Sequence, residues 1–275
     1  MAASKVCLVN ATKPLVLVTG AMGVIAQKVI PKLAEVCDFR LIDREATTVN
    51  GHQVSAVDIT DFAAVLKAVQ GVDAVLHLAI ASSRNFVTDE ALFEADEGDE
   101  YLRFNQATIE VNLRGTYNVL EAARMAGVKR VIYGSSLTVL LGYSDLPKLS
   151  DHLTPKPSNF YAVTKLWGER LGEYFSRAHD LQFLSLRFGT PHPQSDHPKY
   201  ERWLTDDLVR STFVTYEDLA GAIRCALSSP RPAFGCYSIT SAGEGSFVDT
   251  SAGQEIGWRS TEFCHIDGSI TKVKL

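Results

Sequence analysis

The sequence predicts an α/β protein with a Rossmann-type, doubly wound parallel sheet and a small C-terminal part. Short apolar runs alternate with helical patterns from Leu15 to Leu186, which is typical of a parallel sheet covered on both faces. A glycine turn directly follows the first apolar run. Beyond Gly189 the pattern changes to a segment rich in proline and histidine, which indicates a smaller, different region.

The first half of the chain contains buried strands that alternate with helices. The apolar run Leu15–Thr19 predicts a strand, and Gly23–Val36 has the spacing of a helix. The other elements expected here are a strand at Phe39–Ile42, a helix at Asp61–Val69 and a strand at Ala74–Leu78. Pro31 lies inside the first helix and removes a hydrogen bond to the Gln27 carbonyl, so we expect a kink or an irregular middle.

The second half continues the alternation and then returns to a strand. A long helix is expected at Thr108–Ala126, where Gly127 closes its C-terminal end. The elements that follow are a strand at Arg130–Tyr133, a helix at Phe160–Arg177, a strand at Leu181–Leu186, a long loop over Thr190–Asp207, a helix at Glu217–Leu227 and a strand near Cys236–Ile239. The acidic stretch 83–107 reads as a solvated helical insertion, with a lid as the alternative.

Composition and charge exclude several classes of protein. The chain has 275 residues with a formal net charge of -5, which argues against binding to nucleic acid through bulk electrostatics. No apolar run approaches the roughly 20 residues that span a bilayer, and the N-terminus lacks a signal-peptide pattern, so we expect a cytoplasmic protein without membrane contact. Five scattered cysteines without a C-x-x-C pair predict reduced thiols and no metal site.

The glycine turn has the features of a dinucleotide site. Gly20 allows a tight turn, and Gly23 lets the backbone approach a pyrophosphate at the N-terminus of a helix. Asp43 follows Gly20 by 23 residues, near the ~20 expected for a carboxylate that binds the adenosine ribose. Asp43 favours NAD over NADP, although the neighbouring Arg44 could accept a 2′-phosphate.

Further residues are expected to line the same dinucleotide from the ends of neighbouring strands. Asp58 could contact the adenine edge, or it could cap the helix Asp61–Val69. Ala79 and Ile80 follow the strand Ala74–Leu78 and offer apolar backbone. The remaining candidate cofactor contacts are Met22, Val24, Ile25, Ile59, Leu78 and Gly189.

A serine, a tyrosine and a lysine suggest acid–base chemistry. Tyr161 and Lys165 stand four residues apart on one face of a helix, and Ser136 ends the preceding strand, 25 residues before Tyr161. A neighbouring ammonium should lower the pKa of the phenol, so that Tyr161 acts as a general base near neutral pH. Ser136 could then hold the reacting oxygen. Asn112 is a candidate for a helix kink or a water site that links Lys165 to solvent, or a solvent-facing polar residue.

Taken together, these motifs resemble the extended short-chain dehydrogenases/reductases, the group that includes nucleotide-sugar epimerases and dehydratases. The matching pieces keep their order over about residues 15–240: Thr19-Gly20-x-x-Gly23, Asp43, Asp58, His77-Leu78-Ala79, Asn112, Ser135-Ser136, Tyr161 with Lys165, Leu186-Arg187-Phe188-Gly189 and Phe213–Ala220. The resemblance implies a Rossmann fold and NAD as cofactor. It leaves the reaction open, because epimerases, dehydratases and dehydrogenases share these residues.

Within that group the chain looks most like uronate dehydrogenase and related sugar dehydrogenases, which oxidise an anomeric carbon to a lactone. Only 86 residues follow Gly189, which favours a small sugar over a nucleotide-sugar. The resemblance assigns substrate contacts to Ser82, Ser136, Thr190 and Arg202. Leu137 stands where the family has asparagine, so a neutral or phosphorylated aldose is the alternative to a uronate.

The expected reaction is hydride transfer to NAD, with Tyr161, Lys165, Ser136 and Asn112 as the catalytic set. Residues 1–188 would form the NAD-binding domain and 189–275 a small substrate-binding region, whose last strand could return to the sheet. An epimerase or dehydratase that retains NAD is the rival within the enzymes. A dinucleotide sensor without catalysis is the rival outside them. The resemblance also implies a homodimer formed through helices 108–126 and 160–177.

Overall fold

A computed structural model describes residues 13–81, 99–144, 148–192, 200–230 and 232–273. Its main sheet has eight strands in the order β10-β7-β6-β5-β1-β2-β4-β3, and all are parallel except β3. The strands are β1 (Leu15–Thr19), β2 (Asp38–Asp43), β3 (Thr47–Val49), β4 (His52–Ala56), β5 (Ala74–His77), β6 (Arg130–Ser136), β7 (Gln182–Phe188) and β10 (Phe234–Ile239). The predicted Rossmann-type sheet is therefore confirmed.

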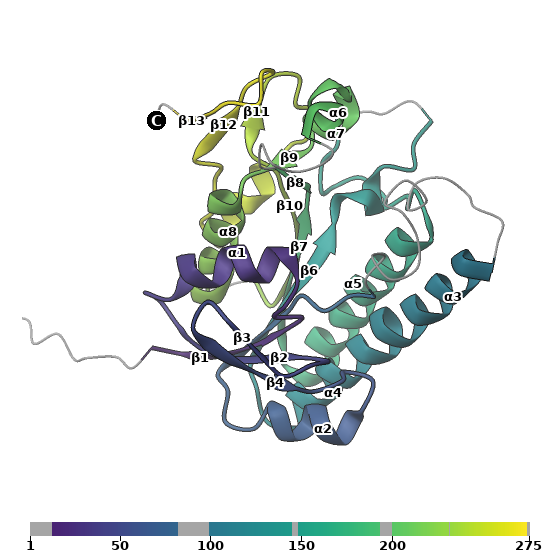
Figure 1. The fold of residues 1–275 in the computed structure, drawn as a ribbon, viewed down its shortest axis with the longest axis vertical. Helices are drawn as coiled ribbons and strands as arrows, with labels where there is room; N and C mark the ends of the chain where they lie inside the picture. Colours follow the sequence, from purple (N-terminus) through teal and green to yellow (C-terminus); the bar gives the residue numbers. More distant parts are fainter. Residues whose placement is uncertain (1–12, 82–98, 145–147, 193–199, 231, 274–275) are drawn as a thin grey trace, which may run out of the picture.

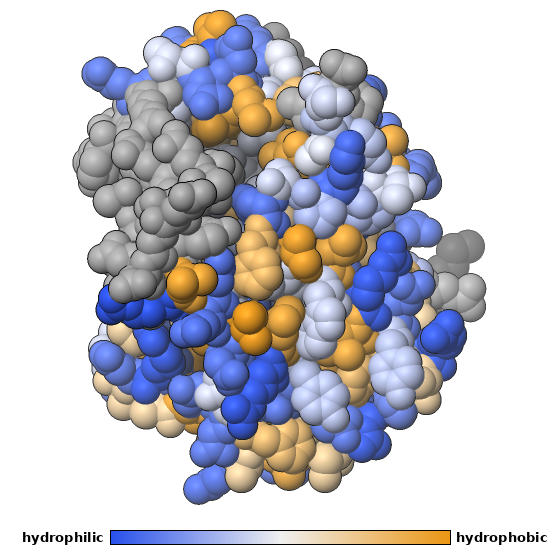
Figure 2. All heavy atoms as spheres, turned by 90° about the vertical axis from the view of Figure 1, so that its right-hand side faces the viewer, coloured by the Kyte–Doolittle hydropathy of each residue, from blue (hydrophilic) through white to orange (hydrophobic). Residues whose placement is uncertain are grey.

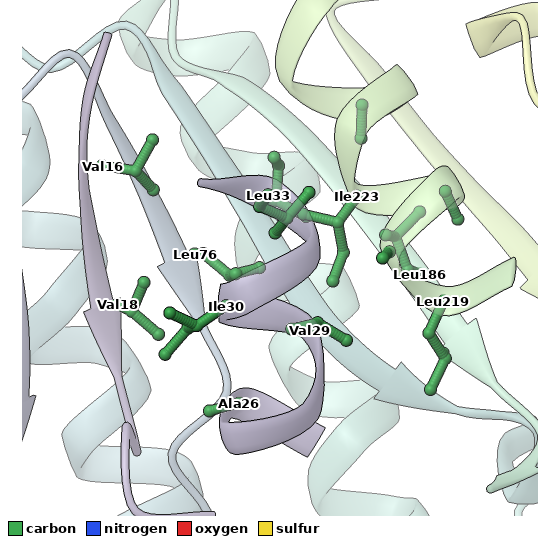
Figure 3. Close-up of a cluster of buried hydrophobic side chains, with 14 of the residues drawn as sticks. Val16, Val18, Ala26, Val29, Ile30, Leu33, Leu76, Leu186, Leu219 and Ile223 are labelled. Carbon is green, nitrogen blue, oxygen red and sulfur yellow. The ribbon is translucent and has the colours of Figure 1, made fainter. Parts of the chain in front are cut away.

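Helices cover both faces of this sheet (Figure 1). The apolar stripe of α1 (Val24–Leu33) and that of α8 (Tyr216–Ser228) pack on one face, where Ile30 and Ile223 meet strand residues such as Leu76 (Figure 3). The other face carries α2 (Phe62–Ala68), α4 (Thr116–Met125) and α5 (Phe160–His179). Each core is built from β-branched and aliphatic side chains of the strands, as the continuous apolar runs predict.

One local feature of the first half was not expected from the sequence. A hairpin joins β3 to β4 through Asn50 and Gly51, which have φ angles of 51° and 78°. Asn-Gly at a two-residue turn is a strong hairpin signal that the strand pattern alone missed. Asn50 also donates from Nδ2 to the Gln27 carbonyl at 2.7 Å. That carbonyl has lost its helical donor to Pro31, which lies inside α1 near its end.

The long central helix starts earlier than expected. It begins as α3 (Asp99–Thr108), passes through a π-helical segment at Ile109–Gly115 and continues as α4. The last part of the predicted insertion 83–107 is thus helical and contributes the buried side chain of Phe104. Residues 82–98 lie outside the described part of the chain. Among the described residues, no helix is both long and apolar enough to cross a bilayer.

The C-terminal part caps one end of the sheet (Figure 1). The expected long loop contains β8 (Thr190–Pro191), which pairs with β9 (Phe213–Val214), and the short helices α6 (Tyr200–Thr205) and α7 (Asp207–Arg210). β10 joins the main sheet beside β7. A second sheet contains β11 (Ala242–Gly243), β12 (Glu262–Cys264) and β13 (Ile270–Lys272).

One buried carboxylate ties this C-terminal part to α8. Asp218 accepts hydrogen bonds from the hydroxyls of Ser241 at 2.6 Å and Ser260 at 2.8 Å. It also accepts from the backbone N–H and the hydroxyl of Thr261, at 2.7 and 2.9 Å. Because the side chain is buried, these partners replace the water that a carboxylate requires.

Candidate active site

The candidate site lies where the strand order of the sheet reverses. β1 has β2 on one side and β5 on the other, so the segments that follow β1 and β5 diverge at their carboxyl ends. Thr19 holds the two segments together, because its carbonyl accepts from the Leu78 N–H and its hydroxyl accepts from the Ala79 N–H, both at 3.2 Å. Ligands of open parallel sheets bind in such a crevice.

The first glycine is required by the approach of these two segments. Gly20 has a φ of 71°, a region that residues with a Cβ rarely adopt. A Cβ at this position would also lie 2.7 Å from both the Cα and the N of Ala79. The turn therefore depends on glycine for its backbone angle and for the space beside Ala79.

The N-terminus of α1 is built differently from those of α2, α5 and α8. Asp61, Asn159 and Thr215 cap α2, α5 and α8 with side-chain oxygens. Gly23 occupies the capping position of α1, without a side-chain cap and without an acidic residue in the first turn. This helix end can offer its N–H groups to a phosphate.

Asp43 is held in place beside that helix end. One carboxylate oxygen accepts from the Met22 N–H at 2.9 Å, and the other accepts from the Arg44 N–H at 2.8 Å. Each oxygen keeps lone-pair capacity for a further donor such as a ribose hydroxyl. The uncapped helix, the glycine turn and this carboxylate fit a dinucleotide, with its pyrophosphate on α1 and a ribose at Asp43.

The remaining predicted cofactor contacts divide into exposed and buried residues. Met22, Val24 and Ile80 are apolar and exposed, and Ile25, Leu78 and Ala79 are partly buried beside them. Ile59 is buried and packs against Gly115, where an added Cβ would come within 2.5 Å of its side chain. Gly189 is buried too, because a Cβ there would meet the Thr212 carbonyl.

Asp58 does not cap α2. Its side chain accepts from the Thr60 N–H at 2.8 Å, while Asp61 accepts from the Ala64 N–H and forms the cap. The expected capping role is wrong because the helix begins three residues later than that role requires. Asp58 is exposed at the end of β4, on the same edge of the sheet as Asp43.

Three successive residues of β6 contact three residues of α5 that stand four apart. The Ser136 side chain lies close enough to the phenol of Tyr161 to lower its pKa. The Gly134 carbonyl accepts from Lys165 Nζ at 2.6 Å. The Ser135 hydroxyl donates to Glu169 at 2.7 Å. Tyr161, Lys165 and Glu169 lie on one face of the helix, so the strand and the helix match along two helical turns.

Two glycines bring α5 close enough for these contacts. A Cβ at Gly168 would lie 2.4 Å from the Tyr133 hydroxyl, and one at Gly172 would lie 2.3 Å from the Phe183 ring. The helix therefore rests on the aromatic side chains of the sheet without room for a methyl group. Ser136 is oriented in turn by Thr138, whose hydroxyl and N–H donate to its oxygen at 2.9 and 3.3 Å.

The electrostatics of this set differ from the sequence expectation. Burial raises the pKa of Tyr161 above its usual range, and the hydrogen bond from Ser136 opposes this in part. Lys165 is buried with its Nζ on the Gly134 carbonyl and 5.7 Å from the centre of the Tyr161 ring. Burial lowers the pKa of Lys165 to about 7, while Glu169 raises it. Ser136 rather than Lys165 is therefore the group that lowers the phenol pKa, and desolvation outweighs it.

Asn112 is buried in the π-helical segment rather than facing solvent. Its Oδ1 accepts from the Ala81 N–H at 2.9 Å, and its Nδ2 donates to the Thr164 hydroxyl at 3.1 Å. Thr164 donates to the Tyr161 carbonyl at 2.7 Å. Asn112 therefore joins the segment after β5 to the helix that carries Tyr161 and Lys165.

The predicted substrate contacts are only partly described. Thr190 is partly buried on β8, and its hydroxyl lies 3.1 Å from that of Thr212. Arg202 is on α6, but its side chain lies outside the described part of the structure. Ser82 is outside the described residues altogether. In the described part, no group of three or more His, Cys, Asp or Glu residues could hold a metal ion.

A buried ion network next to the site was missed by the sequence analysis. Arg187 forms two hydrogen bonds to Glu169, at 2.8 and 2.9 Å, and one to Asp151 at 3.1 Å. Asp151 also accepts from the N–H and the hydroxyl of Ser238. Glu169 could have been found from its spacing, since it repeats the four-residue interval of Tyr161 and Lys165.

His77 is a packed core residue, as expected. Its ring lies 2.7 Å from the Thr19 hydroxyl and 3.0 Å from the Thr116 hydroxyl. Burial, with a smaller effect of Lys165, lowers its pKa to about 3, so the ring is neutral. It joins β1, β5 and α4 beneath the site.

Comparison with known proteins identifies the family to which the chain belongs. Residues 16–233 match the family described as "NAD dependent epimerase/dehydratase family". Uronate dehydrogenase of Pseudomonas putida is 30% identical over 77% of this chain and 69% of its own. NAD-dependent glucose-6-phosphate dehydrogenase of Haloferax volcanii is 27% identical over 78% of this chain and 80% of its own.

A solved structure extends the likeness to the fold. A tyrosine-to-alanine variant of uronate dehydrogenase from Agrobacterium tumefaciens, complexed with NAD, superposes with a TM-score of 0.72. It is 24% identical, and the match covers 92% of this chain and 86% of that one. At this identity the similarity concerns the fold.

Proposed function

The chain belongs to the NAD dependent epimerase/dehydratase family, and from this premise we propose that it oxidises a small sugar at its anomeric carbon to a lactone. It is an NAD-dependent oxidoreductase, a class to which the named sugar dehydrogenases among its relatives also belong. The observation that carries the proposal is that Ser136, Tyr161 and Lys165 lie together at the edge of the sheet that also holds Gly20 and Asp43.

Each of these residues has a task that follows from its position. NAD, when bound, supplies the acceptor for the hydride. Tyr161 takes the proton from the sugar hydroxyl, and Ser136, fixed by Thr138, holds the reacting oxygen. Lys165 keeps a positive charge beside the phenol and would bind the nicotinamide ribose. Because burial raises the pKa of Tyr161, the base needs that positive charge to act near neutral pH.

The substrate class that fits best is a uronate. In this proposal Thr190 and Ser82 hold sugar hydroxyls, and Arg202 binds the carboxylate. Residues 189–275 would form the substrate-binding region. Arg187 is not available for the carboxylate, because Glu169 and Asp151 already occupy its guanidinium. A neutral aldose or a sugar phosphate remains the second candidate, since Leu137, next to Ser136, offers no polar contact to a sugar.

A substrate panel tests the proposal directly. Uronates, neutral aldoses, sugar phosphates and nucleotide-sugars would each be incubated with NAD, and NADH formation followed by absorbance. We expect NADH with a uronate, and a lactone as the first product by NMR. Oxidation of the matching neutral sugar at an equal rate would exclude recognition of the carboxylate. Turnover of a nucleotide-sugar without net NADH would instead identify an epimerase or dehydratase.

We also propose that two copies associate through α4 and α5. Figure 2 shows the side of the molecule that carries these helices, with apolar residues gathered in the middle of the face. Exposed apolar side chains on them include Tyr117, Met125, Val163, Trp167 and Tyr174. Exposed apolar residues that gather on one face are candidates for a protein–protein interface. Light scattering should give a dimer mass, and Val163→Glu should give a monomer.

A further inference from the structure

The buried carboxylate of Glu169 extends the active-site row by one more helical turn. It stands four residues after Lys165 on the same face of α5, and both side chains are buried. Gly134 binds Lys165 and Ser135 binds Glu169, so neighbouring residues of β6 fix the two groups. This chain of contacts links the carboxylate to the lysine through two rigid elements.

The contacts of Glu169 place its charge between two cations. One oxygen accepts from the Ser135 and Ser185 hydroxyls and from Arg187 Nε, at 2.7, 3.2 and 2.9 Å. The other accepts from a terminal nitrogen of Arg187 at 2.8 Å. Arg187 also pairs with Asp151, so its charge is shared between two carboxylates. Glu169 therefore retains negative charge that acts on Lys165.

Building on the proposed function, we propose that Glu169 is a positioning residue that keeps Lys165 protonated and bound to the Gly134 carbonyl. A buried ammonium loses its hydration, and the carbonyl replaces only part of it. A fixed carboxylate one helical turn away favours the protonated form of Lys165 over the neutral form. The role is separate from packing, because a glutamine at this position would fill the same space without the charge.

The other groups around Lys165 contribute little charge. From β6 the ring of Tyr133 lies 4.8 Å away, and burial raises the pKa of its phenol. From α5 the ring of Tyr161 lies 5.7 Å away, and burial raises its pKa as well. From β5 the ring of His77 is neutral, since burial lowers its pKa to about 3.

The network beyond Glu169 completes the set. From β7 Arg187 is a cation bound to Glu169, and Asp151 pairs with Arg187 on the side away from Glu169. From β10 burial raises the pKa of Cys236, which keeps the thiol neutral. Glu169 is thus the one carboxylate among the described residues that raises the pKa of Lys165, which burial lowers to about 7 even with Glu169 present.

The experiment follows Lys165 in the protein without cofactor. The protein would be labelled with [¹³C]lysine, and the Cε resonance of Lys165, assigned with Lys165→Met, would be titrated by NMR. We expect Glu169→Gln to lower the titration midpoint by about one to two pH units relative to the wild type. Asp151→Asn is the matched control, because it removes a carboxylate from the same network on the far side of Arg187.

The outcomes separate charge from structure. An unchanged midpoint in Glu169→Gln, or an equal shift in Asp151→Asn, overturns the proposal. If Glu169→Gln does not fold, the double variant Glu169→Gln/Arg187→Met removes both members of the ion pair. Its midpoint must still be lowered, although by less than in the single variant, because the Arg187 cation is lost as well. In turnover, the alkaline loss of kcat should move to lower pH in Glu169→Gln, with little change in KM for the sugar. Failure to oxidise any sugar would reject the proposed function and leave the NMR result valid.

Discussion

Replacing Gly20 by alanine tests whether the first turn depends on both its backbone angle and its free space. At a φ of 71°, alanine costs about 1–2 kcal/mol relative to glycine. The added Cβ would lie 2.7 Å from two backbone atoms of Ala79, which have no rotamer with which to move aside. Overpacking of this kind costs about 1–3 kcal/mol. We therefore expect Gly20→Ala to lower the free energy of unfolding by about 2–5 kcal/mol.

Gly71 provides the matched control for the steric cost of the Cβ in Gly20→Ala. Its φ is 70°, but no heavy atom lies within 4 Å of an added Cβ. It precedes the amino end of β5, away from the edge of the sheet that carries Gly20. Gly71→Ala should therefore lose only the backbone part, about 1–2 kcal/mol. The difference between the two variants measures the contact with Ala79.

Urea denaturation and cofactor titration together read out the result. The midpoint should fall more for Gly20→Ala than for Gly71→Ala, with similar m-values if both variants unfold alike. NAD affinity, measured by calorimetry, should weaken in Gly20→Ala, because the turn must move, and should be unchanged in Gly71→Ala. Equal losses of stability in the two variants would refute the argument that Gly20 is needed for space.

Four further predictions follow from the site. Tyr161→Phe should lower kcat by about 10²–10⁴ while NAD affinity changes little, and near-normal turnover would remove Tyr161 from the mechanism. Asp43→Asn should shift the ratio of kcat/KM values from NAD towards NADP, and an unchanged ratio would show that Asp43 does not select the cofactor. Arg202→Met should lower kcat/KM for a uronate, with a loss of transition-state stabilisation of about 2–4 kcal/mol, and should leave kcat/KM for a neutral sugar unchanged. Equal losses for both sugars would contradict carboxylate binding. His77 is neutral in the folded state down to about pH 3 but takes up a proton near 6.5 when unfolded, so stability is fully present above 6.5 and is lost as the pH falls towards 3. A His77→Gln variant should lose stability less steeply in acid, and an equal slope in urea titrations would disprove this origin.

The order of the main strands and helices could be predicted because each strand of the central sheet is buried on both faces. Leu15–Thr19 and Ala74–His77 read as continuous apolar runs, which leaves few alternatives. β3 and β4 are short, lie at the edge of the sheet and alternate with polar residues. Their apolar signal was too weak, and only the Asn50-Gly51 turn signal could have identified them.

The individual residues of the candidate site could be predicted from the sequence, but the contacts between residues of different elements could not. Tyr161, Lys165 and Ser136 follow from their spacing in the chain. The pairing of Glu169 with Arg187 joins residues that belong to different elements, and no local pattern shows which elements will meet. The raised pKa of Tyr161 was missed for a related reason, since desolvation depends on how closely α5 lies on the sheet.

The hydrogen bonds between Asp218 and the C-terminal segment also have a consequence for folding during synthesis. During synthesis α8 leaves the ribosome before Ser260 and Thr261, and most of the hydrogen bonds of the carboxylate come from these two residues. Until they arrive, Asp218 must remain hydrated, so α8 cannot dock permanently on the nascent sheet. Docking of α8 on the sheet thus depends on the segment that carries Ser260 and Thr261.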